Sequence, residues 1–179
     1  LKRQILPSLK VQDLPPVDIV LVSHTHPDHF DKAALLQMSP KPIVVMPWGR
    51  GISLRKKGFQ VVDLHPWQTW EYKGIKIKAI PARHNAWHNL GYIIYIQGTK
   101  IYFTGDTKLF NDLKQLKREN IDLMLMPYDG TPVIGNIWTI EQAAQAVKIV
   151  EPKICVPLHW ETFRNWLTHR PTTPPSVFT

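Results

Sequence analysis

A cluster of side chains that commonly bind metal ions occupies residues 22–31, which read VSHTHPDHFD. His24, His26, Asp28 and His29 follow directly after the apolar run DIVLV. Imidazole nitrogens and carboxylate oxygens are the donors that zinc and related cations take from proteins. His24 and His26, two positions apart in a turning loop, can bind one cation, while Asp28 and His29 are displaced toward a second position. The stretch therefore predicts a metal site.

Three further residues of the same types each follow an apolar strand, at His84 in PARH, Asp106 in FTGD and His159 in PLHW. Loops at strand ends are where a rigid sheet can direct side chains toward one point. We expect one ion to be bound by His24, His26 and His84, a second by Asp28, His29 and His159, and both to be bridged by Asp106. Three protein ligands per ion leave an open position for water, and two divalent ions can hold a hydroxide at neutral pH.

Apolar runs of strand length must position these residues. Strands are predicted at 18–22, 42–46, 59–64, 69–80 with a turn at Lys73-Gly74, 90–104 with a turn at Gln97-Gly98, 122–126 and 153–158. Helices are predicted at 31–38, 108–120 and 139–150, the last with Thr139 as its cap. Hairpins mixed with strand–helix–strand units predict a layered α/β (α+β) domain with sheets inside and helices outside.

Length and composition limit the class of protein. The 179 residues, 44% hydrophobic, suit a single domain over 1–179 that ends in an extended tail at 168–179. The apolar runs are far shorter than the ~20 residues of a membrane span. The single Cys155 excludes an intramolecular disulfide, so we expect a cytoplasmic protein. The net charge of +8 favours a small anionic substrate, but the basic residues are scattered, so nucleic acid is not an expected partner.

The motifs together carry a family resemblance. SHTHPDHFD resembles the HxHxDH motif of the metallo-β-lactamase superfamily, and PARH, FTGDT and VPLHW resemble its later metal motifs in the right order. GYIIYIQGTKIYFTGDT and the region from IDLMLMPYDG to VPLHWETF look most like the branch of ascorbate-6-phosphate lactonase and N-acylphosphatidylethanolamine phospholipase D. The resemblance implies a four-layer αββα sandwich, the two-ion ligand set given above, and Asp28 as acceptor of the attacking water's proton.

The resemblance also implies strands before the histidine motif, yet only 17 residues precede DIVLV. We therefore expect a sandwich that lacks its first strands. An uncovered sheet edge invites pairing with another chain. If the chain is complete, we expect either a homo-oligomer or poor stability.

Several alternatives stay open. In PARHNAWH, His88 competes with His84 as third ligand of the first ion, and we favour His84 with His88 on the substrate side. Asp129 in PYDG orients a substrate, serves as a proton donor or caps the following turn, and we favour the cap. Zinc suits the donors, and manganese and iron are compatible with them. The predicted function is hydrolysis of an ester, lactone or phosphodiester by a metal-bound hydroxide; the alternative is an inactive metal-binding or nucleic-acid-binding module.

Overall fold

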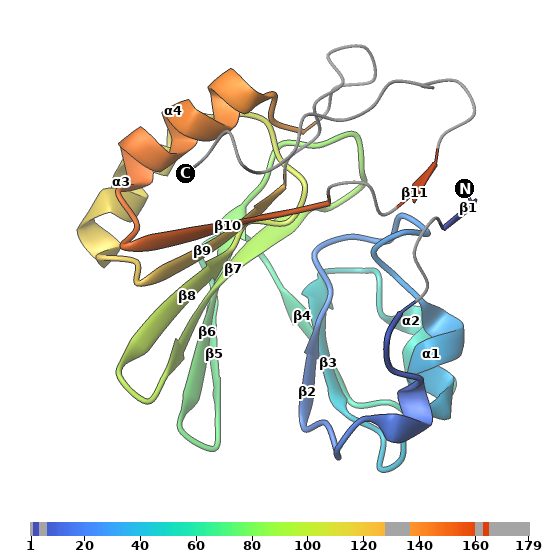
Figure 1. Ribbon diagram of the computed structural model, residues 1–179. Coiled ribbons are helices and arrows are strands. Elements are labelled where there is room, and N and C mark those ends of the chain that lie inside the picture. Colours follow the sequence, from blue (N-terminus) through green and yellow to red (C-terminus); the bar gives the residue numbers. More distant parts are fainter. Residues whose placement is uncertain (1, 4–6, 128–136, 160–162, 165–179) are drawn as a thin grey trace.

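Two facing β-sheets with helices on their outer sides make up the fold in the computed structural model, which describes residues 2–3, 7–127, 137–159 and 163–164 (Figure 1). The strands are β1 Lys2–Arg3, β2 Ile19–Leu21, β3 Ile43–Pro47, β4 Val61–Leu64, β5 Thr69–Tyr72, β6 Ile75–Pro81, β7 Leu90–Ile96, β8 Thr99–Phe103, β9 Leu123–Pro127, β10 Ile154–Leu158 and β11 Phe163–Arg164. The helices are α1 Lys32–Gln37, α2 Ile52–Arg55, α3 Leu113–Leu116 and α4 Ile140–Val150, with 3₁₀ turns η1 Val11–Asp13 and η2 Lys117–Glu119.

The larger sheet has six strands in the order β10-β9-β8-β7-β6-β5. Strands β8, β9 and β10 are parallel to one another, and β7 is antiparallel to both β8 and β6. Strand β6 therefore runs in the same direction as β8, β9 and β10. The carboxyl ends of these four strands lie at one edge of the sheet, which is the edge that receives the loops after them.

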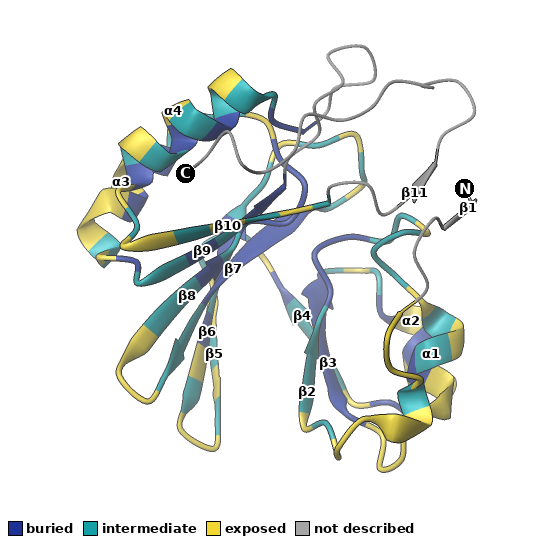
Figure 2. Cartoon of the chain, viewed as in Figure 1, coloured by how far each residue is buried: buried dark blue, intermediate teal, exposed yellow. Residues whose placement is uncertain are grey.

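The smaller sheet has the order β2-β3-β4, and its strands are all parallel. Its outer face packs on α1 and α2 through an apolar cluster that includes Val44, Met46 and Leu54. A second cluster, which includes Val45, Leu90 and Tyr92, lies between the two sheets. Burial is accordingly deepest along β3 and in the middle of the large sheet (Figure 2).

A third cluster fills the space between the large sheet and helices α3 and α4. Trp138, Tyr102 and Ile93 are fully buried there. The four layers run helix, sheet, sheet, helix, so the predicted layered α/β class is confirmed. Helix α4 begins at the predicted cap, because the Thr139 side chain accepts a hydrogen bond from the Gln142 backbone N–H.

The predicted strands are confirmed to within about two residues at each end, including both hairpins. Their turn residues Lys73, Gly74, Gln97 and Gly98 have φ of 47°, 79°, 48° and 79°, which is the backbone of a two-residue type I′ turn. The pairing of β1 with β11, the short helix α2 and the turn η1 were not predicted.

The prediction of one helix over 108–120 is wrong, because only α3 and η2 form there. The Lys108 backbone N–H donates to the Arg83 carbonyl at 2.7 Å, which holds the start of the segment against the loop after β6.

Within the described residues no helix is both long and apolar enough to cross a membrane. The predicted tail at 168–179 lies outside the described residues.

Candidate metal centre

All seven predicted ligands meet at the edge of the large sheet where β6, β8 and β10 end. His84, Asp106 and His159 follow these strands, and the loop of His24 to His29 follows β2 of the facing sheet. Their donor atoms form three groups within which all donors lie 4.8 Å or less apart. The groups are His24, His26 and His84; His24, His29 and Asp106; and Asp28, His29 and His159.

The first group consists of three imidazoles. His26 Nδ1 lies 3.1 Å from His24 Nε2 and 3.1 Å from His84 Nε2. A ring nitrogen has either one proton or one lone pair in the ring plane, so His26 Nδ1 cannot make good hydrogen bonds to both neighbours. A cation among the three nitrogens would satisfy all of them. The arrangement therefore fits a divalent ion of the kind that accepts nitrogen ligands.

The other two groups combine imidazoles with carboxylates. Asp28 Oδ2 lies 3.4 Å from His29 Nε2 and 3.3 Å from His159 Nε2, and Asp106 Oδ2 lies 3.2 Å from His29 Nε2 and 3.6 Å from His159 Nε2. His29 Nε2 is buried, and its contacts are too poorly aligned to count as hydrogen bonds. Asp106 Oδ2 is also 3.7 Å from His84 Nε2 in the first group. Asp106 thus lies between the groups, where a bridging ligand would lie.

The pKa values of the residues in the centre depend on burial and on the charges of their neighbours. Burial lowers the pKa of His24 to about 3, and repulsion from His29 adds to the effect. Burial opposes protonation of His29 as well, but the carboxylates of Asp106 and Asp28 raise its pKa to about 9. Burial favours the neutral acids, yet the neighbouring imidazoles hold the pKa of Asp28 and of Asp106 below the usual range. The centre therefore keeps two ionised carboxylates that attract positive charge.

Hydrogen bonds join the two sheets beside this centre. The Leu90 N–H donates to the Ser23 carbonyl at 3.0 Å, and the Tyr92 hydroxyl donates to the Val22 carbonyl at 2.8 Å. Gly105, with φ of 59°, sits so close that a Cβ would meet Ser23 Cβ at 2.8 Å and the Leu90 carbonyl oxygen at 2.9 Å. Glycine at this position lets the loop of Asp106 approach the loop of His24.

Sequence reasoning missed the role of Ser23. Its hydroxyl lies 3.0 Å from His24 Nδ1, which turns His24 Nε2 toward the other imidazoles. The sequence feature that could have indicated this role is the position of Ser23 directly before His24 in SHTH. Asp31, the last acid of VSHTHPDHFD, lies outside the three donor groups: it caps α1 by accepting from the Ala34 N–H at 2.8 Å.

His88, the competitor of His84, is in none of the donor groups. Its ring stacks on Trp48 with centroids 3.9 Å apart, and its Nδ1 donates to the Trp48 carbonyl at 2.7 Å. The other face of Trp48 stacks on His65 at 4.6 Å. His88 therefore ties the loop of His84 to the end of β3. Asp129 lies outside the described residues.

The assignment of each residue as a metal ligand stays a prediction.

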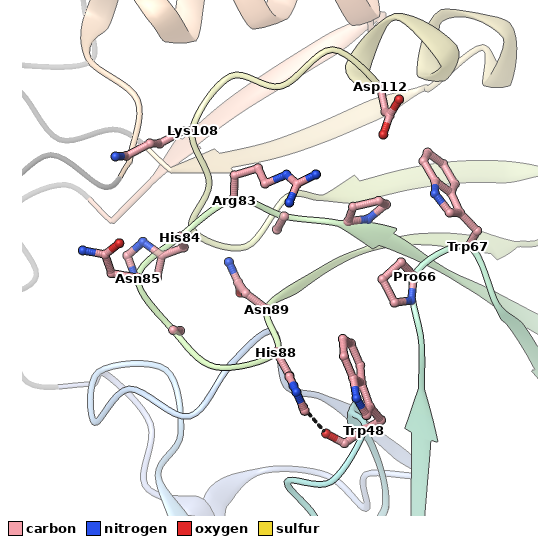
Figure 3. Close-up of a pocket in the computed structure, with 13 residues that line it drawn as sticks. Trp48, Pro66, Trp67, Arg83, His84, Asn85, His88, Asn89, Lys108 and Asp112 are labelled. Atoms are coloured by element: carbon pink, nitrogen blue, oxygen red, sulfur yellow. Dashed lines mark hydrogen bonds between the residues drawn. The ribbon is translucent and has the colours of Figure 1, made fainter.

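A cavity of about 610 Å³ opens beside His84 (Figure 3). Its wall combines the rings of Trp48 and Trp67 with the side chains of Arg83 and Asn89. Neither Arg83 nor Asn89 was singled out from the sequence, although both flank the predicted ligand in PARHNAWHN. The centre thus has an adjoining space large enough for a small molecule.

Comparison with known proteins supports this interpretation of the fold. The family model described as "Beta-lactamase superfamily domain" matches residues 1–160. A UPF0173 metal-dependent hydrolase of Thermoplasma acidophilum is 32% identical over 163 residues, which is 87% of this chain and 70% of that protein.

Solved structures share the fold. Igni18, a metallo hydrolase from Ignicoccus hospitalis, matches with a TM-score of 0.71 at 27% identity, over 82% of this chain and 65% of that one. CmlA, a diiron β-hydroxylase from Streptomyces venezuelae, matches with a TM-score of 0.71 at 19% identity, over 82% of this chain and 36% of that one.

The chain thus spans about two thirds of the length of the hydrolases from Thermoplasma acidophilum and Ignicoccus hospitalis. The predicted likeness to one branch of the superfamily stays a prediction, but the family itself is established. The chain belongs to the metallo-β-lactamase superfamily, within the UPF0173 family of metal-dependent hydrolases.

Proposed function

We propose that the centre holds two divalent metal ions and hydrolyses an ester, lactone or phosphodiester bond in a small anionic molecule. The observation that carries the proposal is the overlap of the three donor groups, which places imidazoles and carboxylates from both sheets around Asp106. Two ions there would supply a nucleophile at neutral pH and offset negative charge on the attacked group.

The ligand set divides around Asp106. His24, His26 and His84 would hold one ion, and Asp28, His29 and His159 the other. Zinc is favoured by the many imidazoles, with manganese and iron as candidates. Iron remains among the candidate metals because CmlA, which shares this fold, is a diiron enzyme.

Asp28 has a further role in this proposal. Its carboxylate contacts His159 and His29, and these contacts hold its pKa below the usual range. An acid that ionises so readily is a weak base. Asp28 would therefore orient the attacking water and accept its proton only when the reaction drives the transfer.

The fold contributes positive charge near the reacting group. Arg83 and Lys108 both line the cavity beside His84, and Asp112 is the acid among its lining residues. This excess supports an anionic substrate. Likeness to the lactonase and phosphodiesterase branch of the superfamily supports ester, lactone or phosphodiester chemistry in particular.

Elemental analysis of protein purified without added metal, followed by assays on chromogenic esters, lactones and phosphodiesters with and without a chelator, tests the proposal. We expect close to two ions per chain and chelator-sensitive turnover of at least one class. Asp106→Ala should lose both ions, whereas Asp63→Asn, on β4 and outside the donor groups, should retain them. Full metal content without chelator-sensitive activity on any class would contradict the proposal.

A further inference from the structure

The cavity beside His84 presents an arginine without an ionic partner. Arg83 is exposed, and its guanidinium forms no ion pair or hydrogen bond within the described residues. Asp112 lines the same cavity, but its Oδ1 accepts from Gln115 Nε2 at 3.1 Å and it is not paired with Arg83. Figure 3 shows the guanidinium extending across the cavity on the side of Trp67 and Asp112.

The backbone of Arg83 is fixed even though its side chain is free. Its N–H donates to Thr107 Oγ1 at 2.9 Å, and its carbonyl accepts from the Lys108 N–H at 2.7 Å. These bonds anchor it to the loop that carries Asp106. Arg83 is also the residue before His84, so its Cα lies about 3.8 Å from that of a candidate ligand. The backbone of Arg83 is therefore fixed relative to the loops that carry His84 and Asp106.

A second polar side chain, that of Asn89, lines the same cavity. Asn89 is only 7% exposed, and its Nδ2 donates to the Asp106 carbonyl at 2.6 Å. That bond fixes the orientation of the amide, so Oδ1 is an acceptor, and it is buried without a hydrogen-bond partner. The bond to the Asp106 carbonyl therefore holds Asn89 in place at the inner wall of the cavity.

We propose that this cavity is the substrate-binding site and that Arg83 binds an oxyanion group of the substrate, either a carboxylate or a phosphate. The inference rests on the proposed function and names the substrate class for that same centre. Carboxylate and phosphate share the pair of oxygens that matches the planar guanidinium fork. Trp48, Trp67 and Pro66 form an apolar part of the wall, which would receive the carbon portion of the molecule.

Equilibrium binding to the metal-loaded full chain tests the inference directly. Phenyl phosphate and phenylacetate serve as the two oxyanion probes, and quenching of tryptophan fluorescence reports binding. Arg83→Gln should weaken at least one probe about 10-fold or more, the range of a lost charge-assisted hydrogen bond. The probe that is weakened identifies phosphate or carboxylate as the preferred group.

Arg118→Gln is the matched control. It removes the same charge from an exposed position on η2 that does not line this cavity. We expect its probe affinities to stay within about 2-fold of the parent, since only distant surface charge changes. Equal weakening by both variants, or no weakening by Arg83→Gln, would overturn the inference.

Kinetics with a pair of esters separates this inference from the proposed function. On 4-nitrophenyl hemisuccinate, which is anionic, Arg83→Gln should raise KM about 10-fold, and its effect on neutral 4-nitrophenyl acetate should be smaller. If neither ester is hydrolysed but Arg83→Gln still weakens probe binding, the proposed hydrolysis of esters fails and the oxyanion site stands. If both are hydrolysed and Arg83→Gln affects them equally, the oxyanion site fails and the proposed function stands.

Discussion

Replacing His88 with alanine should weaken metal binding at the first donor group without removing a donor from it. His88 lies four residues after His84, and its ring stacks on Trp48 at 3.9 Å while its Nδ1 donates to the Trp48 carbonyl at 2.7 Å. The hydrogen bond contributes about 1 kcal/mol and the stacking about 1 kcal/mol. If both serve to hold the loop of His84 in place, their loss lowers metal affinity by at most about 30-fold.

Competition with a fluorescent chelator measures the affinity, and elemental analysis measures the stoichiometry. His88→Ala should keep its full complement of ions, whereas His84→Ala, which removes one of three imidazoles around the first position, should lose an ion. His65→Ala is the control, because it removes only the far side of the stack at 4.6 Å and should change affinity less than about 3-fold.

Two results would refute the reasoning. Loss of an ion in His88→Ala but not in His84→Ala would make His88 the ligand. An unchanged affinity in His88→Ala would show that its contacts with Trp48 do not position the loop.

Three further predictions concern the surroundings of the centre. Ser23→Ala should lower metal affinity about 10-fold in the same competition assay while leaving the stoichiometry intact, because it removes the hydroxyl 3.0 Å from His24 Nδ1. Gly105→Ala should destabilise the fold by several kcal/mol in urea unfolding, since its Cβ would lie 2.8 Å from Ser23 Cβ at a positive φ; a loss below about 1 kcal/mol would contradict the close approach. Glu119→Gln should cost about 1 kcal/mol at pH 7, because Lys78 Nζ donates to the carboxylate at 2.7 Å and helps to hold its pKa low despite partial burial. A lowered carboxyl pKa stabilises the fold above the unfolded pKa and this effect is lost as pH falls through the folded pKa, so the difference between parent and variant in unfolding experiments should shrink as the pH is lowered.

The convergence of the predicted ligands was readable from the sequence because strand ends are marked locally. Apolar runs end at His84, Asp106 and His159, and a loop after a strand leaves from the edge of the sheet. The hairpin turns at Gly74 and Gly98 were equally local, since each reverses the chain once. The turn at Gly74 makes β5 and β6 antiparallel, and the turn at Gly98 makes β7 and β8 antiparallel.

The length of the helix in 108–120 was not readable in this way. The apolar residues of this segment have helical periodicity. The Lys108 N–H, however, donates to the Arg83 carbonyl, which lies 25 residues away in the sequence. Local propensity is a weak guide where such a tertiary contact competes with it.

By itself, the sequence predicted a set of candidate ligands and the sheet edge at which they meet, because residue type and strand endings are local properties of the chain. Only the tertiary structure decided how the neighbours of His84 divide their tasks. His88 packs on Trp48, and Asn89 donates from its amide to the Asp106 carbonyl. The Arg83 guanidinium lines the cavity without an ion-pair partner among the residues that the structure describes. These roles depend on contacts with residues that are distant in the sequence, so they cannot be predicted from the segment PARHNAWHN alone.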